Sequence, residues 1–158
     1  MIANDLSKTP IHTAGVVVFD GDAVLLVRHE KESRQQLGMH GLPAGRIEQD
    51  ESELQTAIRE LEEETGLRVE AGDLIRLAET PGDILNLKEG PRYCTFAVFV
   101  AKKWNGDVQK KETKVTPDWI HMRELAAVEM LPNVHWAIKE AQKLVKRRAC
   151  IEKRLFLC

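Results

Sequence analysis

Three glutamates stand close together in this sequence: Glu60, Glu63 and Glu64. At about 100° per residue, a helix would place them on one arc of roughly 100°, where like charges three and four positions apart repel one another. Arg59 beside them cannot neutralise three negative charges. Hard oxygen ligands gathered at one helical position suit Mg²⁺ or Mn²⁺. The group is therefore a candidate metal site; the alternative is a solvated acidic helix surface.

The surrounding residues predict the helix that this site needs. Either Asp50 or Ser52 can cap its N-terminus, and Gly66 occupies the place where a helix ends in a left-handed residue. The apolar residues recur at positions i, i+3, i+4 and i+7, which predicts one buried stripe: Leu54, Ala57, Ile58 and Leu61.

The stretch from Gly45 to Leu67 follows the pattern G-x5-E-x7-R-E-Leu-x-E-E-x-G-Leu, with no fixed position missing. This pattern resembles the signature of the Nudix hydrolases. The resemblance implies an α/β fold, the Nudix-type α/β/α sandwich with a mixed β-sheet between helices. It also implies Mg²⁺-dependent cleavage, with Mn²⁺ as a substitute, of the pyrophosphate bond in a nucleoside diphosphate linked to another group.

The same resemblance assigns roles to individual residues. The implied metal ligands are the carboxylates of Glu60, Glu63 and Glu64 and the backbone carbonyl of Gly45. Glu51 would be a further ligand or a support, and Arg59 would hold a glutamate by a bidentate pair. The implied catalytic residues are therefore Glu63, Glu60, Arg59 and Glu51.

Two features of the site stay open from the sequence. The general base is either a glutamate of the pattern or an acid from a later loop, for which Glu112 and Asp118 are candidates; each also reads as a surface acid. The family often has Trp near position 40 and Gly at position 44, whereas this chain has His40 and Ala44. Alanine keeps position 44 small, and the role of His40 is open.

Substrate-binding candidates are Arg28, His29 and Asn133. Arg28 and His29, with Lys31, gather positive charge at a strand end, which fits substrate phosphates or a solvated edge equally well. Asn133 is predicted mainly as a helix cap, with reading of a purine base as the alternative. The substrate is expected to be a nucleoside triphosphate, oxidised or not; the alternatives are ADP-ribose or a nucleotide sugar, and a module that binds nucleotides without hydrolysis.

The remaining pattern predicts strands that alternate with two helices, typical of a layered α/β domain. Thr80 to Arg92 is predicted as a long loop, and Asn105-Gly106 as a hairpin turn. The predicted strands cover residues 14–19, 23–28, 67–69, 74–79, 93–102 and a short stretch at 119–120. A helical turn is predicted at 123–127 and the last helix at 134–148.

Composition limits the classes of function. The 158 residues, 43% of them apolar, suit one domain, with residues 1–10 as a loose leader and 149–158 as a C-terminal tail. A net charge of −2 offers no electrostatic case for a nucleic acid polymer or an anionic membrane. Three widely spaced cysteines indicate a reducing, cytoplasmic setting. The apolar end Leu155-Phe156-Leu157 leaves a homodimer open.

Overall fold

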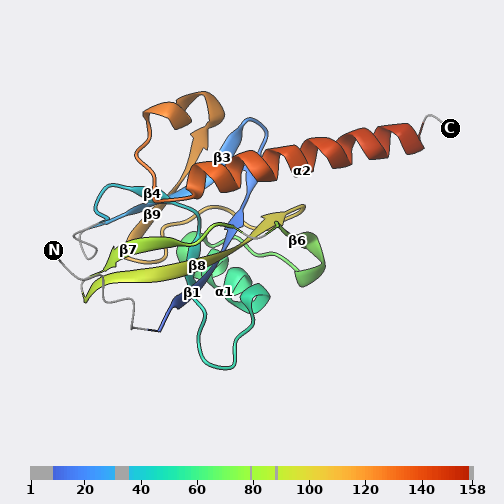
Figure 1. Cartoon of the computed structure of the whole chain (residues 1–158). Coiled ribbons are helices and arrows are strands. Elements are labelled where there is room, and N and C mark those ends of the chain that lie inside the picture. Colours follow the sequence, from blue (N-terminus) through green and yellow to red (C-terminus); the bar gives the residue numbers. More distant parts are fainter. Residues whose placement is uncertain (1–8, 31–35, 79, 88, 157–158) are drawn as a thin grey trace.

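The structure of the chain is a computed structural model that describes residues 9–30, 36–78, 80–87 and 89–156 (Figure 1). Its elements follow one another in this order: β1 (Ile11–Val17), β2 (Phe19–Asp20), β3 (Ala23–His29), β4 (His40–Gly41), β5 (Ala44–Arg46), α1 (Glu53–Thr65), the 3₁₀ turn η1 (Ala71–Asp73), β6 (Leu74–Arg76), β7 (Asp83–Leu87), β8 (Gly90–Ala101), β9 (Val115–His121), the 3₁₀ turn η2 (Met122–Ala127) and α2 (Val134–Leu155).

The strands form two sheets. In the first, β1 and β8 run parallel, from the pair Ile11 and Cys94 to the pair Val17 and Val100. Strand β5 is antiparallel to β1, and β6 and β7 are antiparallel to β8. In the second, β2, β4 and β9 all pair antiparallel with β3. The predicted mixed sheet is therefore present.

The first sheet lies between the two helices, because alternate residues of its strands point to opposite faces. On β8, Ala97 and Phe99 pack in the cluster that contains α1, whereas Val98 and Val100 pack in the cluster that contains α2. Figure 1 shows α1 and α2 on opposite sides of β1 and β8. The predicted α/β/α sandwich is confirmed.

Helix α1 begins and ends where the sequence predicts. Ser52, not Asp50, is its cap: the Ser52 hydroxyl accepts a hydrogen bond from the Gln55 backbone N–H at 3.1 Å, and the Gln55 side chain accepts one from the Ser52 N–H at 2.9 Å. Gly66 closes the helix with φ of 81°, and its N–H donates to the Glu62 carbonyl. These contacts satisfy backbone groups that a helix end otherwise leaves unpaired.

The prediction of a long loop from Thr80 to Arg92 is wrong. Most of it forms a hairpin in which β7 pairs with the first half of β8, from Asp83 opposite Cys94 to Leu87 opposite Gly90. Gly90 takes the left-handed conformation at the turn, with φ of 107°. The glycines and prolines of this stretch suggested a loop, but they stand at the ends of the strands, where they do not interrupt the pairing.

Two shorter predictions differ for a shared reason. Arg68 and Asn105 exchange both backbone hydrogen bonds, at 2.9 and 2.8 Å, and form an isolated bridge. The strand predicted over 67–69 is therefore reduced to a single bridge residue, Arg68. Asn105-Gly106 turns the chain, but the turn does not connect two strands of a hairpin. A contact between segments far apart in sequence replaces the two local structures that the residues favour.

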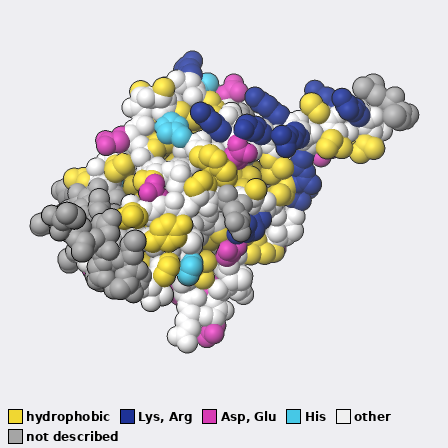
Figure 2. All heavy atoms as spheres, viewed as in Figure 1, with side chains coloured by type: hydrophobic (Ala, Val, Ile, Leu, Met, Phe, Trp, Pro, Cys, Tyr) yellow, Lys and Arg dark blue, Asp and Glu magenta, His cyan; other side chains and the backbone are white. Residues whose placement is uncertain are grey.

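Helix α2 is longer than predicted. It runs to Leu155, so residues 149–155 are helical and not a loose tail. Its last turns stand away from the body of the protein, with Leu155 72% and Phe156 89% exposed (Figure 1). Lysine and arginine side chains gather along this helix in Figure 2. Within the described residues, no helix combines the length and apolarity that spanning a membrane requires.

Other strand predictions need only new bounds. Strand β3 covers the predicted 23–28, and β9 extends the short stretch at 119–120 to seven residues. The helical turn predicted at 123–127 is η2. Most of the predicted leader, together with Lys31 and Leu157, lies outside the described residues.

Candidate functional site

Arg59 and Glu51 form a bidentate ion pair at the start of α1. The Arg59 Nε donates to Glu51 Oε1 at 2.7 Å, and Nη2 donates to Oε2 at 2.9 Å. Glu51 Oε2 also accepts from the Thr56 hydroxyl at 2.6 Å and from the Glu48 N–H at 3.2 Å. The Arg59 hydrogen bonds, followed by that of Thr56, lower the pKa of Glu51 to about 2. Glu51 is therefore fixed as a carboxylate.

Arg59 also binds two of the predicted metal ligands. Its Nη1 donates to Glu60 Oε1 at 2.7 Å and to Glu63 Oε2 at 3.0 Å, and its Nη2 donates to the Arg46 carbonyl at 3.3 Å. The hydrogen bonds to Glu51, followed by that to Glu60, raise the pKa of Arg59, so that the guanidinium stays charged. One side chain thus holds three of the carboxylates that the sequence analysis singled out.

Glu64 lies deeper in the structure. Its side chain is buried, with 6% of the residue exposed, and one carboxylate oxygen accepts from the Ala44 N–H at 3.1 Å. Burial, followed by the charge of Glu60, raises the pKa of Glu64 to about 9. Burial also raises the pKa of Glu60. No lysine or arginine of the described residues pairs with Glu64, so a cation would relieve a real electrostatic cost here.

Gly45 packs directly against the Glu60 carboxylate. A Cβ at position 45 would overlap the carboxylate atoms of Glu60, so any larger residue there would displace that carboxylate. Strand β5 is held in place by its pairing with β1, where Gly45 lies opposite Ala14. Strand β5 and helix α1 therefore pack closely against each other where the glutamates gather.

The residues present fit a divalent cation by their chemistry: carboxylate oxygens with raised pKa values beside a backbone segment that approaches closely. Within the described part of the chain, no three His, Cys, Asp or Glu side chains are already arranged around one point. Glu60 and Glu63 instead bond to Arg59. Ion binding would therefore compete with the hydrogen bonds that Arg59 donates to these two side chains.

Replacing Gly45 by alanine is expected to lower metal-dependent activity by roughly 10- to 100-fold, because the new methyl group displaces the Glu60 carboxylate. The measurement is the initial rate of nucleotide hydrolysis as a function of Mg²⁺ concentration. Gly72→Ala is the matched control, since nothing lies within 4 Å of a Cβ at that position. An unchanged rate and Mg²⁺ requirement in Gly45→Ala would contradict this account.

The two candidates for a general base lie in different surroundings. The charge of Glu112 raises the pKa values of both Glu60 and Glu64, so Glu112 lies within electrostatic range of the carboxylates. Asp118 is on β9, and its charge acts on His40 instead. Of these two acids, only Glu112 therefore acts electrostatically on the carboxylates of Glu60 and Glu64.

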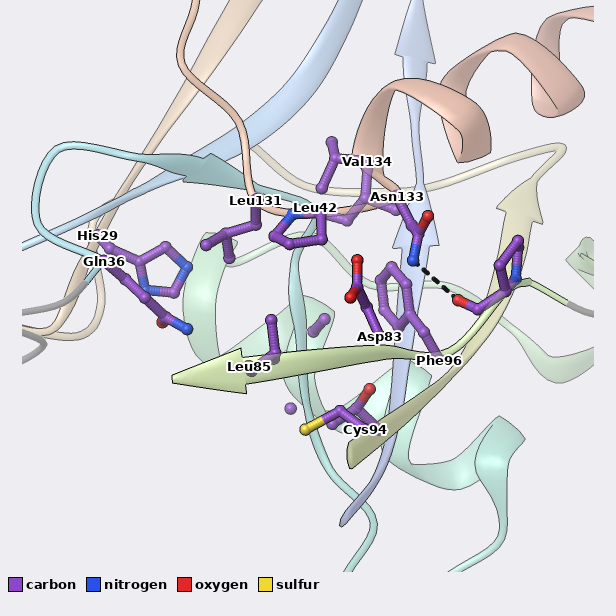
Figure 3. Close-up of a pocket in the computed structure, with 16 residues that line it drawn as sticks. His29, Gln36, Leu42, Asp83, Leu85, Cys94, Phe96, Leu131, Asn133 and Val134 are labelled. Carbon is purple, nitrogen blue, oxygen red and sulfur yellow. Dashed lines mark hydrogen bonds between the residues drawn. The ribbon is translucent and has the colours of Figure 1, made fainter. Parts of the chain in front are cut away.

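A cavity of about 180 Å³ lies beside strand β5 and is shown in Figure 3. Ala44 and Gly45, which contact Glu64 and Glu60, also line it, so one short segment separates the cavity from the carboxylates. The apolar part of the lining includes side chains from three regions of the chain: Leu42, Leu85, Phe96, Leu131 and Val134.

His29 and Asn133 line this cavity, whereas Arg28 does not. The Arg28 side chain is exposed and pairs with Glu30 at 3.1 Å. Burial, followed by the charge of His40, lowers the pKa of His29, so its imidazole favours the neutral form. His29 can thus offer a hydrogen bond to a substrate but adds little positive charge near neutral pH.

Asn133 does not cap α2 with its side chain. Its backbone is left-handed, with φ of 66°, and its side-chain Nδ2 donates to the Pro81 carbonyl at 2.9 Å (Figure 3). Asn133 is thus the N-cap residue that the sequence predicts, and its carbonyl accepts from the Ala137 N–H at 3.0 Å, but its side chain makes no capping hydrogen bond. Few residues other than glycine adopt this backbone conformation, and asparagine is among the most tolerant of it.

Asp83 and Phe96 are among the cavity residues that the sequence did not indicate. Asp83 was assigned to a loop because the hairpin of β7 and β8 was not foreseen. Phe96 lies on the face of its strand opposite to the predicted residues, and aromatic side chains in strands are more often part of the core. The regular period of β8 was the available signal, since it places Cys94 and Phe96 on one face, and both line the cavity.

Comparison with known proteins shows which family this sequence resembles. The NUDIX domain family model matches residues 9–143. A curated relative, the 8-oxo-dGDP phosphatase NUDT18 of Danio rerio, is 32% identical over 105 residues, which make up 66% of this chain but only 29% of that protein.

Two solved structures share the fold. A MutT NUDIX hydrolase from Burkholderia pseudomallei superposes with a TM-score of 0.67 at 18% identity, covering 84% of this chain and 98% of that one. The NUDIX domain of Shewanella oneidensis NrtR, in complex with ADP ribose, superposes with a TM-score of 0.71 at 23% identity, covering 87% and 90%. With a family match over most of its length and the same fold, the chain belongs to the Nudix family of hydrolases.

Proposed function

We propose that the chain is a Mg²⁺-dependent pyrophosphohydrolase of a nucleoside di- or triphosphate, oxidised or not, with Mn²⁺ as a substitute for Mg²⁺. One observation carries the proposal: Ala44 and Gly45 touch the carboxylates on one side and line the cavity on the other. A nucleotide whose base enters the cavity has its phosphates beside the glutamates.

Glu60, Glu63 and Glu64, with the Gly45 carbonyl, would hold the ion. When bound, a divalent ion polarises phosphoryl oxygens and lowers the pKa of an attacking water. Arg59 keeps the carboxylates oriented through its hydrogen bonds to Glu51, Glu60 and Glu63. These assignments are proposals, and each can be tested by the loss of one carboxylate at a time.

Hydrolysis adds one water across a P–O–P bond and yields a nucleotide with fewer phosphates and a released phosphate or pyrophosphate. The proton of the water needs an acceptor. Glu112 fits this role because it lies within electrostatic range of Glu60 and Glu64. His29 is placed to contact the substrate from the cavity side, and Asn133 to contact the base.

The substrate class rests on the cavity and on one relative. The cavity combines an aromatic side chain, Phe96, with the polar groups of Asn133 and His29, as a site for a nucleobase requires. The relative from Danio rerio is named for an oxidised guanine nucleotide. Its similarity supports a nucleoside polyphosphate over ADP-ribose or a nucleotide sugar.

The test is a panel of nucleoside di- and triphosphates, 8-oxo-dGDP, 8-oxo-dGTP, ADP-ribose and nucleotide sugars, with and without Mg²⁺. We expect hydrolysis of at least one nucleoside polyphosphate that EDTA abolishes, with products that identify the broken P–O bond. Thermal unfolding with Mg²⁺ and a nonhydrolysable nucleotide should give a higher Tm than either alone. Binding without any product would favour a nucleotide-binding module, and silence in all assays would refute the proposal.

We also propose a reducing cytoplasmic setting, because Cys94 and Cys150 are free thiols. A homodimer through the exposed end of α2 is the corresponding proposal for assembly, since Ile151, Leu155 and Phe156 are exposed there. Light scattering that reports only the monomer mass would exclude it.

A further inference from the structure

Asp83 stands at the cavity on a rigid element. It is the first residue of β7 and pairs in register with Cys94 of β8, so its backbone is held by the sheet. Gly82 before it packs against the Tyr93 side chain, where a Cβ would overlap the phenol. Figure 3 shows the Asp83 carboxylate rising from β7 on the same side of the cavity as Asn133, near the Phe96 ring.

One oxygen of this carboxylate is occupied and the other is available. Asp83 Oδ1 accepts a hydrogen bond from the Ile84 N–H at 2.7 Å. In the part of the chain that the structure describes, Oδ2 has no hydrogen-bond partner and forms no ion pair. A carboxylate oxygen only accepts hydrogen bonds when ionised, so a ligand beside it must present a donor.

Asn133 adds a second acceptor to the same wall. Its Nδ2 donates to the Pro81 carbonyl, which can only accept, so the orientation of the carboxamide is determined. The Asn133 Oδ1 then remains as an acceptor. No lysine or arginine lines the cavity among the described residues. The cavity therefore disfavours a phosphate group and favours an uncharged ring that carries N–H groups.

We propose that Asp83 is a specificity-determining residue that selects nucleobases with adjacent N–H donors, which are the guanine-type bases. This inference rests on the proposed function, because it concerns the base of the same substrate. Guanine presents its ring N1–H beside a 2-amino group. Adenine has its amino group beside an acceptor nitrogen, and thymine has one N–H between two carbonyls, so neither base can present N–H donors to the Asp83 carboxylate and the Asn133 amide oxygen together.

Asp83 is exposed in the free protein, so a base that enters the cavity displaces water from its carboxylate. A matched N–H replaces that water and is stabilised by the negative charge, whereas an acceptor at the same place is repelled by the carboxylate. Oxidation of guanine at C8 leaves this edge intact and converts N7 into an additional N–H donor. Guanine and 8-oxoguanine are therefore both expected to bind through Asp83.

The test measures binding of nucleoside monophosphates by calorimetry, in wild type and Asp83→Asn. Monophosphates have no pyrophosphate bond, so the readout is independent of hydrolysis. In the variant we expect the Kd of dGMP and 8-oxo-dGMP to rise by roughly 10- to 100-fold, with dAMP and dTMP within about two-fold of wild type. The amide oxygen of asparagine can still accept from the Ile84 N–H, so the Tm should not change.

Asp20→Asn is the matched control, because Asp20 is exposed on β2 and does not line the cavity. An equal effect of Asp83→Asn on all four nucleotides, or no effect on any, would overturn the inference while leaving the proposed hydrolysis intact. A wild-type protein that binds none of the four and hydrolyses no member of the substrate panel would overturn both.

Discussion

Glu63→Gln is expected to lower kcat/KM for the best nucleotide substrate by roughly 100- to 1,000-fold, with little change in Tm. The Glu63 side chain is 46% exposed on the helix surface, and within the described residues its one ion pair is with Arg59 at 3.0 Å. Glutamine keeps the length of the side chain and one oxygen but removes the negative charge. The fold should tolerate this change, whereas an ion that needs the charge should not.

Glu62→Gln is the control for that experiment. Glu62 is adjacent in sequence but exposed, and no ion pair is recorded for its side chain in the described part of the chain. Its variant should keep wild-type rates and the wild-type Mg²⁺ requirement. Steady-state rates over a range of Mg²⁺ concentrations compare the two variants. If Glu63→Gln retained full activity, Glu63 would not be an ion ligand in the reaction.

Arg59→Ala is expected to lower both stability and activity. The side chain is 24% exposed and bonds to Glu51, Glu60 and Glu63. Its loss leaves partly buried carboxylates without a counter-charge, which should reduce the free energy of unfolding by about 1–3 kcal/mol. The same loss frees the carboxylates to move, so kcat/KM should fall by at least about 10- to 100-fold.

Urea unfolding at neutral pH, with and without Mg²⁺, measures the effect of Arg59→Ala. Bound ion should restore part of the lost stability, because it replaces the missing positive charge. Lys143→Ala is a suitable control, since its pair with Glu140 at 2.7 Å is well exposed and contributes little. Equal stability of Arg59→Ala and wild type in EDTA would show that the ion pairs of Arg59 are not needed for the fold.

Local features of the chain were predictable because short-range interactions determine them. The spacing of apolar residues and the cap signals place α1 where the structure has it, with Ser52 and Gly66 at its two ends. The nine fixed positions from Gly45 to Leu67 indicated the family, which the NUDIX domain match confirms. Helix geometry also brings Arg59 within reach of Glu63, four residues away.

Tertiary structure alone decided how the distant segments meet. Strands β7 and β8 pair as a hairpin in a stretch for which the sequence predicted a loop. This hairpin places Asp83 at the cavity. The Asn133 side chain bonds to Pro81, fifty-two positions away, and not to the first turn of its own helix. Such contacts depend on which surfaces the folded chain brings together, and local residue preferences do not encode that choice. The sequence by itself therefore determined the helix and its carboxylates, while the packing of the sheet decided what lies beside them.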